Sequence, residues 1–83
     1  ARHFGPAGIR VNAIAPGAVP GGGFQAPPGM AEGIPLRRFG TPADVAAMTV
    51  AVLSERFGAY VTGTTIVVDG GIALTNWIPP ATA

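Results

Sequence analysis

Ile9-Arg-Val-Asn-Ala-Ile-Ala-Pro-Gly17 and Tyr60-Val-Thr-Gly-Thr-Thr-Ile-Val-Val-Asp-Gly-Gly71 are the two stretches that decide the fold. Each is an apolar run rich in β-branched residues that stops at a turn of proline or glycine, which is typical of a buried parallel strand. About fifty residues lie between the two strands that these runs indicate, and that length is ample for the crossover that parallel strands require. The sequence therefore predicts a right-handed βαβ unit with strands at Ile9–Ala15 and Thr64–Asp69.

The crossover contains one well-marked helix, which we expect from Pro42 to about Glu55. Thr41 supplies an N-cap hydroxyl, Pro42 fits the first helical position, and Asp44 offers a carboxylate at the third. Apolar side chains then recur at helical spacing and form one stripe. The stripe consists of Val45, Met48, Thr49, Val52 and Leu53.

A loop rich in glycine and proline, Pro16 to Pro35, joins the first strand to this helix. Its composition excludes a long regular element, and we expect at most one helical turn around Gly29–Gly33. Loops of this length are often lids or binding loops. Gly21–Ala26 formally matches a dinucleotide-binding fingerprint, but Pro27-Pro28 prevents the helix that such a site needs.

Composition indicates a part of a larger domain. The chain has 83 residues, of which 48% are hydrophobic and 11% are charged. Two buried strands and one helix would leave wide apolar faces uncovered, and such faces normally meet another layer or another subunit. Ala1–Phe4 is typical of the end of a helix that Gly5-Pro6-Ala7-Gly8 terminates.

Charge and composition exclude several classes of function. The net charge is +1, and the five scattered arginines form no basic stripe, so we expect no nucleic-acid partner. The absence of cysteine excludes disulfides and thiolate metal sites, and His3 has no acid or serine at a workable spacing, so we expect no metal site. No apolar run reaches the length of a membrane span. We therefore expect a cytoplasmic protein with no membrane contact.

A candidate site follows the first strand directly, at Pro16-Gly17-Ala18-Val19. Ligands of open α/β sheets bind outside the carboxyl ends of the strands. A Pro-Gly pair there fixes one dihedral angle and lets the next backbone approach a flat ligand closely. An ordinary strand-to-loop turn is the alternative reading of these four residues.

These four residues, the two strand segments and Arg38–Ala46 together resemble the last third of the short-chain dehydrogenase/reductase family. The resemblance covers Ala1 to about Leu74 and implies an α/β fold, the C-terminal βαβ portion of a doubly wound parallel (Rossmann) sheet. On this basis we expect residues 1–83 to form the C-terminal part of a single nucleotide-binding oxidoreductase domain whose N-terminal portion is absent from this sequence.

The resemblance also implies which residues meet the cofactor. In the family, the residues matching Pro16 and Gly17 lie against the nicotinamide, and backbone groups at the position of Val19 hold its carboxamide. Gly21 stands where the family commonly has a threonine whose hydroxyl contacts the cofactor. The chain would therefore lack one hydrogen bond, worth about 1 kcal/mol net. NAD and NADP both remain open, because the residues that distinguish them lie outside this sequence.

We assign no catalytic residue in this chain. The family's proton donor is a tyrosine followed four residues later by a lysine. This sequence has no lysine, and its single tyrosine, Tyr60, is followed by Val61, Thr62, Gly63 and Thr64. We expect the catalytic motif upstream of Ala1, so the 83 residues alone would be inactive.

The implied activity is hydride transfer between a nicotinamide and a carbonyl or alcohol substrate, such as a 3-oxoacyl compound or a small ketone or sugar. The resemblance further implies a homo-oligomer, a dimer or tetramer, with contacts on the last helix and strand; the Val45/Met48/Val52 stripe and the tail are candidates. A non-catalytic truncated module that acts in subunit association is the alternative.

Structural roles are predicted for the remaining polar residues. Asn12 lies inside an apolar strand, where its amide must bond to neighbouring backbone. Arg38 anchors the loop to the start of the helix, and Asp69 with the following glycines ends the last strand. Trp77 either covers a ligand or packs the tail against a neighbouring subunit.

Overall fold

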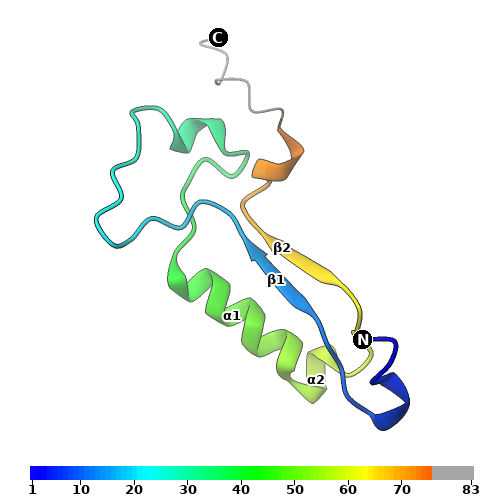
Figure 1. Cartoon of the computed structure of the whole chain (residues 1–83). Coiled ribbons are helices and arrows are strands. Elements are labelled where there is room, and N and C mark those ends of the chain that lie inside the picture. Colours follow the sequence, from blue (N-terminus) through cyan, green and yellow to red (C-terminus); the bar gives the residue numbers. More distant parts are fainter. Residues whose placement is uncertain (76–83) are drawn as a thin grey trace.

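The computed structural model describes residues 1–75 of the chain (Figure 1). Strands β1 (Ala13–Pro16) and β2 (Thr65–Val68) pair in parallel and in register, with Ala13 opposite Thr65. Helix α1 (Pro42–Leu53) connects them and packs against both strands (Figure 1). The predicted βαβ unit is confirmed.

β1 starts later than the predicted Ile9–Ala15. Before Ala13, one backbone bond joins the two segments, from the N–H of Gly63 to the carbonyl of Val11 (2.9 Å), and side chains supply the other bonds. The amide nitrogen of Asn12 donates to the carbonyl of Val61 (2.9 Å), and its amide oxygen accepts from the backbone of Thr64 (3.2 Å). This confirms the structural role predicted for Asn12. One polar side chain thus extends the pairing beyond the strand itself.

The predicted start of α1 is confirmed in detail. The Thr41 hydroxyl accepts a bond from the backbone N–H of Asp44 (3.1 Å), and the Asp44 carboxylate accepts one from the backbone N–H of Thr41 (2.8 Å). This reciprocal capping box satisfies two donors that a helix start would otherwise leave free.

The end of the helix differs from the prediction of one helix to Glu55. Ser54 adopts extended backbone angles (φ −74°, ψ 143°) and ends α1, and a second short helix, α2 (Glu55–Gly58), follows. The Ser54 hydroxyl donates to the carbonyl of Ala51 (2.8 Å) and accepts from the N–H of Phe57 (3.1 Å). A serine able to cap both helices explains why the chain turns here.

A distant arginine completes the carboxyl end of α1. The last turn of α1 carries no basic residue. Instead, the Arg10 guanidinium donates to the carbonyls of Val52 (2.9 Å), Leu53 (3.2 Å) and Val61 (3.0 Å). Helix ends expose such carbonyls, so Arg10 ties the segment before β1 to α1 and to the approach to β2.

The apolar stripe of α1 turns inward, toward the sheet. Val45 and Val52 are half-buried, and Thr49 and Val52 face Ile14 of β1 around a cavity of about 260 Å³. Leu53, which the prediction included in the stripe, is 72% exposed, and Val50 is 66% exposed. Met48 is 39% exposed, so the expectation that the stripe forms a subunit contact stays a prediction.

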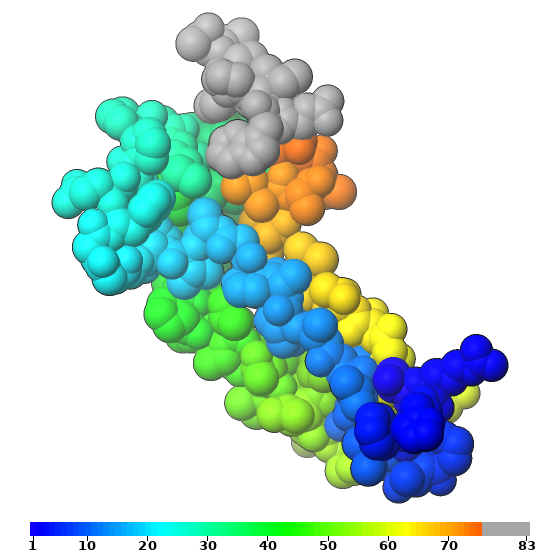
Figure 2. All heavy atoms as spheres, in the orientation of Figure 1, coloured from blue at the N-terminus to red at the C-terminus, as the bar shows by residue number. Residues whose placement is uncertain are grey.

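Large apolar side chains remain exposed over much of the described surface. Ile34, in the loop, is the single buried hydrophobic side chain within residues 1–75. The exposed ones include Phe4, Ile9, Val11, Phe57, Tyr60 and Val67. Figure 2 shows the early residues gathered at one end of the molecule and the loop at the other. The exposed apolar side chains agree with the uncovered apolar faces that the composition predicted.

Three 3₁₀ turns complete the description: η1 (Gly5–Ala7), η2 (Ala31–Gly33) and η3 (Ile72–Leu74). η2 confirms the helical turn predicted in the loop. Ala1–Phe4 forms a turn in which the N–H of Gly5 donates to the carbonyl of Ala1 (2.9 Å), and it leads directly into η1. The helix end predicted here stays a prediction. None of the helices within residues 1–75 is long and apolar enough to cross a bilayer. Trp77 lies outside the described residues.

Candidate functional site

The candidate site lies where β1 and β2 both end. Parallel strands bring their carboxyl ends to one edge of the sheet. Pro16 is the last residue of β1, and the N–H of Gly17 donates to the carbonyl of Val68 (3.0 Å), the last residue of β2. The loop therefore leaves the sheet from a fixed point.

The position of Gly17 requires glycine because it lies close to another residue of this chain, Asp69. A Cβ atom there would stand 2.5 Å from the Cβ and 2.8 Å from the Cα of Asp69. Gly17 does not have a positive φ. Its small size lets the two strand ends pack closely, which is a different reason from the ligand contact that the sequence suggested.

Val19 offers the two backbone groups that a carboxamide would need. Its side chain is half-buried, with Cγ2 3.2 Å from where a Cβ on Gly40 would stand. The neighbouring Ala18 carbonyl accepts a bond from the N–H of Gly40 (2.9 Å) and so fixes this backbone. Within residues 1–75, neither the N–H nor the carbonyl of Val19 has a hydrogen-bond partner. One donor and one acceptor match the two polar groups of a primary amide.

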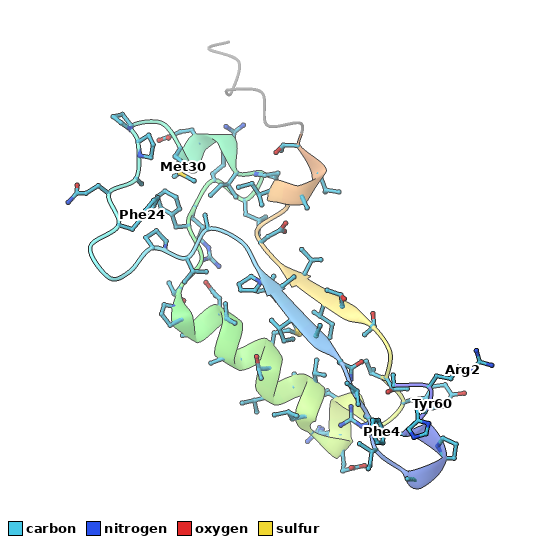
Figure 3. All side chains as sticks on the ribbon, viewed as in Figure 1. Arg2, Phe4, Phe24, Met30 and Tyr60 are labelled. Atoms are coloured by element: carbon cyan, nitrogen blue, oxygen red, sulfur yellow. The ribbon has the colours of Figure 1, made fainter. Side chains whose placement is uncertain are left out.

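Gly21 lies on the exposed part of the loop. Its carbonyl accepts a bond from the N–H of Phe24 (3.1 Å), a side chain labelled in Figure 3. A Cβ at Gly21 would meet no atom within 4 Å, and its φ is not positive. The structure thus groups Pro16, Gly17 and Val19 at the strand end, whereas Gly21 contributes only backbone farther along.

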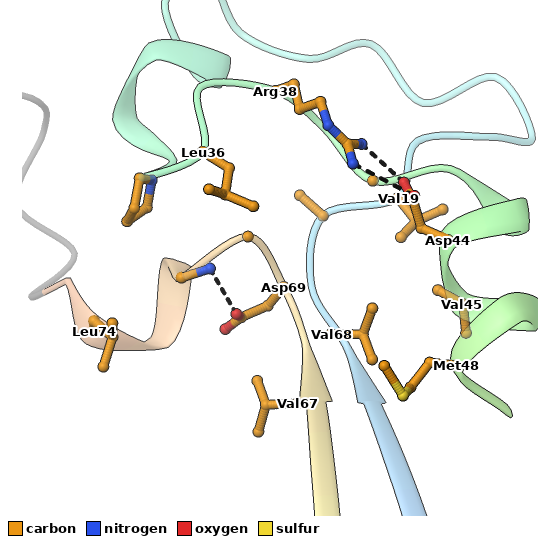
Figure 4. A pocket seen from close by; sticks show the side chains of 15 residues that line it. Val19, Leu36, Arg38, Asp44, Val45, Met48, Val67, Val68, Asp69 and Leu74 are labelled. Carbon is orange, nitrogen blue, oxygen red and sulfur yellow. Dashed lines mark hydrogen bonds and ion pairs between the residues drawn. The ribbon is translucent and has the colours of Figure 1, made fainter. Parts of the chain in front are cut away.

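A cavity of about 500 Å³ adjoins these residues, and the sequence reasoning did not predict it. Figure 4 shows its lining side chains, which come from the loop, α1, β2 and η3. Most of them are apolar, and Arg38 and Asp44 lie together at one side (Figure 4). No local pattern could have revealed it, because its walls come from segments far apart in the sequence. The labelled apolar lining residues are Val19, Leu36, Val45, Met48, Val67, Val68 and Leu74.

The charged pair beside the cavity is structural. Arg38 Nη1 lies 2.8 Å from Asp44 Oδ2, and the same nitrogen donates to the carbonyl of Phe39 (3.0 Å). The hydrogen bond from Arg38, and then those from Thr41, hold the pKa of Asp44 well below its usual range, and the Asp44 carboxylate raises the pKa of Arg38. Asp44 is therefore ionised at neutral pH, and the predicted anchoring role of Arg38 is confirmed.

No catalytic constellation is found in the described part of the chain. Tyr60 is fully exposed near Phe4, at the end of the molecule opposite the loop that carries Phe24 and Met30 (Figure 3). Residues 1–75 contain no group of three or more acidic, histidine or cysteine side chains that could hold a metal ion.

Known proteins share both the sequence and the shape of this chain. Peroxisomal 2,4-dienoyl-CoA reductase from Danio rerio is 40% identical over 82 residues, which cover 89% of this chain and 27% of that protein. A short chain dehydrogenase from Bacillus anthracis is 37% identical with a TM-score of 0.78, over 93% of this chain and 32% of that one. Acetoin dehydrogenase from Enterobacter cloacae is 30% identical with a TM-score of 0.74, over 100% and 32%.

The chain thus spans less than a third of the length of these relatives. Its parallel strand pair and crossover helix are the matching portion of their doubly wound sheet. A family model described as enoyl-(acyl carrier protein) reductase also matches residues 1–73. With fold, sequence and family model in agreement, the chain belongs to the short-chain dehydrogenase/reductase family.

Proposed function

We propose that residues 1–83 are the C-terminal part of one nucleotide-binding oxidoreductase domain that transfers hydride between NAD or NADP and a carbonyl or alcohol carbon. Family membership implies a nicotinamide cofactor. The share of less than a third of each relative's length supports a role as one part of a larger domain. The bound cofactor would supply or accept the hydride.

In this proposal the chain's own task at the cofactor is to hold and orient the nicotinamide ring. The observation that carries it is the free N–H and carbonyl of Val19 at the carboxyl end of β1. Pro16 and Gly17 would lie against the ring, and Gly21 would contribute backbone alone. Gly17, bonded to Val68, and Ala18, bonded to Gly40, give this contact a rigid base.

The proton donor would come from the remainder of the domain, because this sequence has no lysine and therefore no Tyr-x-x-x-Lys motif. Residues 19–36 would border the substrate and exclude water as the loop closes. Arg38, bound to Asp44, would keep the far end of that loop at the start of α1.

We propose a small neutral or apolar substrate, such as a 3-oxoacyl compound or a small ketone or sugar. The apolar lining beside Val19 favours such a ligand over a polyanion. The relatives named above include a 2,4-dienoyl-CoA reductase and an acetoin dehydrogenase, so both kinds of compound belong in a substrate panel.

A homo-oligomer in the cytoplasm completes the proposal. A second copy would meet the last strand, β2, and the surface of α1 where Met48, Val50 and Leu53 are exposed. Light scattering of the purified protein, with Val50→Glu as the disrupting variant, tests the assembly.

The activity is tested with the longest protein that carries this sequence. We expect turnover that follows the absorbance of reduced nicotinamide, with a strong preference for one of NADH and NADPH, on at least one member of the substrate panel. Binding of neither dinucleotide would overturn the proposal.

The alternative function is a non-catalytic module that acts in subunit association, and the many exposed apolar side chains favour it. Measurements of self-association and of dinucleotide binding on the same purified protein distinguish the module from the oxidoreductase. Self-association without any dinucleotide binding would support the module, whereas dinucleotide binding with turnover would exclude it.

A further inference from the structure

The most buried apolar side chain of the described structure belongs to the loop and to neither strand nor helix. Ile34 is 2% exposed. It directly follows η2, and its N–H donates to the carbonyl of Ala31 (3.1 Å). A loop that only connected two elements would have no need for such burial.

Ile34 lies against the turn that follows β2. The N–H of Leu36 donates to the carbonyl of Gly70 (3.0 Å). A Cβ on Gly70 would stand 2.9 Å from Cγ2 of Ile34, and one on Gly71 would stand 2.9 Å from Cβ and Cγ of Pro35. Both glycines have positive φ, 65° and 95°. Only glycine combines this backbone with so close an approach.

The turn itself is held rigidly. The Asp69 carboxylate accepts bonds from the N–H groups of Gly71 (2.8 Å) and Ala73 (2.8 Å). These bonds fix the turn and the start of η3. Asp69 therefore supports the surface on which Ile34 rests, beyond its predicted role of ending the strand.

The other end of the loop is fixed to the same strand. Gly17 donates to the carbonyl of Val68, two residues before Gly70. Between residues 19 and 33, the backbone bonds of the described structure stay within the loop: Phe24 to Gly21, Met30 to Pro27, and Gly33 to Met30. The loop is thus tethered at two points, both at the carboxyl end of β2 (Figure 1).

We propose that the Gly70–Gly71 turn is a seat for Ile34 and that this contact sets the position of residues 19–33 over the substrate. The inference rests on the proposed function, since it assumes that this loop borders the substrate. Ile34 is then a positioning residue: it touches neither cofactor nor substrate. The nicotinamide contact at Gly17–Val19 has its own tether and does not depend on the seat.

Two kinds of measurement test the seat in the longest protein that carries this sequence. In Ile34→Ala, we expect amide hydrogen exchange at Ile34 and Leu36 to rise about tenfold or more, because the loop end loses its buried contact. We also expect KM for the substrate to rise about tenfold with kcat changed less than about twofold, and an unchanged Kd for the reduced dinucleotide. Ile34→Val should restore most of both values.

Gly71→Ala and Gly8→Ala form the matched pair. Both glycines have positive φ, 95° and 78°, but a Cβ on Gly8 would meet no atom within 4 Å. Backbone strain is therefore similar in the two variants, and only Gly71→Ala disturbs the seat. Gly71→Ala should reproduce the exchange and KM changes of Ile34→Ala, and Gly8→Ala should leave both near wild type.

Unchanged exchange at Leu36 in Ile34→Ala, or equal changes in Gly8→Ala, would overturn the seat. If Ile34→Ala does not fold, exchange at Leu36 in Gly71→Ala compared with Gly8→Ala gives the decision. Hydrogen exchange also distinguishes a failure of this proposal from a failure of the proposed function. A protein without dinucleotide turnover would refute the oxidoreductase. Faster exchange at Leu36 in Ile34→Ala would still support the seat as an anchor of the loop.

Discussion

The two ends of the β1–β2 pair are built in opposite ways. At the amino end, side chains satisfy the backbone: Asn12 bridges to Val61 and Thr64, and Arg10 caps the end of α1. At the carboxyl end, glycines let backbones touch, and Val19 keeps both of its polar groups free. A binding site needs free groups on a rigid base, and Val19 at the carboxyl end provides them.

The comparison predicts that variants at the amino end change stability alone, whereas variants at the carboxyl end also change binding. Gly58→Ala should have the largest effect. A Cβ at this buried glycine would collide with the carbonyl of Val52 and stand 3.1 Å from Arg10 Nη1. We expect a loss of about 3 kcal/mol in the free energy of unfolding, measured by chemical denaturation.

Gly5→Ala is the control for that variant, because a Cβ there would meet no atom within 4 Å. It should leave the free energy of unfolding within about 0.5 kcal/mol of wild type. The dinucleotide affinity of folded Gly58→Ala should also be unchanged, and a large change in affinity would contradict the expectation that the amino end affects stability alone.

Gly17→Ala is the counterpart at the carboxyl end. Its Cβ would meet Asp69 at 2.5 Å, so the two strand ends must separate. We expect a loss of about 2 kcal/mol in stability and, because Val19 moves as well, a dinucleotide Kd raised about tenfold. Isothermal titration checks the second effect, and full affinity in this variant would contradict the placement of the ring.

Arg10→Met should lower the free energy of unfolding and leave the dinucleotide affinity unchanged. It leaves three carbonyls without their charged donor, and we expect a cost of about 2 kcal/mol. Arg10→Lys should recover part of it, because an ammonium group can reach fewer of these carbonyls at once. Thermal unfolding of the three proteins gives the ranking.

Gly21→Thr should raise the dinucleotide affinity of the carboxyl end. The site has room for a side chain and no positive φ. A hydroxyl here would add one hydrogen bond to the cofactor, worth about 1 kcal/mol, or about a fivefold lower Kd. Gly21→Val is the control without the hydroxyl, and equal affinity for the two variants would refute the added bond.

Asp44→Asn should have the smallest effect, since the pair with Arg38 is exposed (57% and 35%). The folded protein holds the pKa of Asp44 below its unfolded value of about 4. The carboxylate therefore stabilises the fold above pH of about 4, and this stabilisation is lost as pH falls through the lower folded pKa. The free energies of unfolding of wild type and Asp44→Asn should therefore converge at acid pH. A difference that grows as the pH falls would contradict the lowered pKa of Asp44.

Local patterns in the sequence predicted the parallel strands and the capping box of α1. They were sufficient because each depends on residues close together in the chain: a continuous apolar run that ends at proline or glycine, or Thr41 three residues before Asp44. The cofactor role of Pro16, Gly17, Val19 and Gly21 stays a prediction, as it rests on the family resemblance.

Contacts between distant parts of the chain could not be predicted in this way. Arg10 bonds to a carbonyl 42 residues away, and Ile34 is buried against a turn that the sequence places after the second strand. In the sequence, Gly17 could belong either to a ligand site or to an ordinary strand-to-loop turn, and only the fold shows Asp69 beside it. Burial and close approach follow from the path of the whole chain.

The most direct test compares amide hydrogen exchange at both ends of the strand pair, with and without saturating NADH or NADPH, in the longest protein that carries this sequence. We expect the cofactor to slow exchange of the Val19 N–H about tenfold or more, while exchange of the Thr64 N–H, held by Asn12, stays unchanged. Protection at Thr64, or an unaltered Val19 in a protein saturated with dinucleotide, would contradict this expectation.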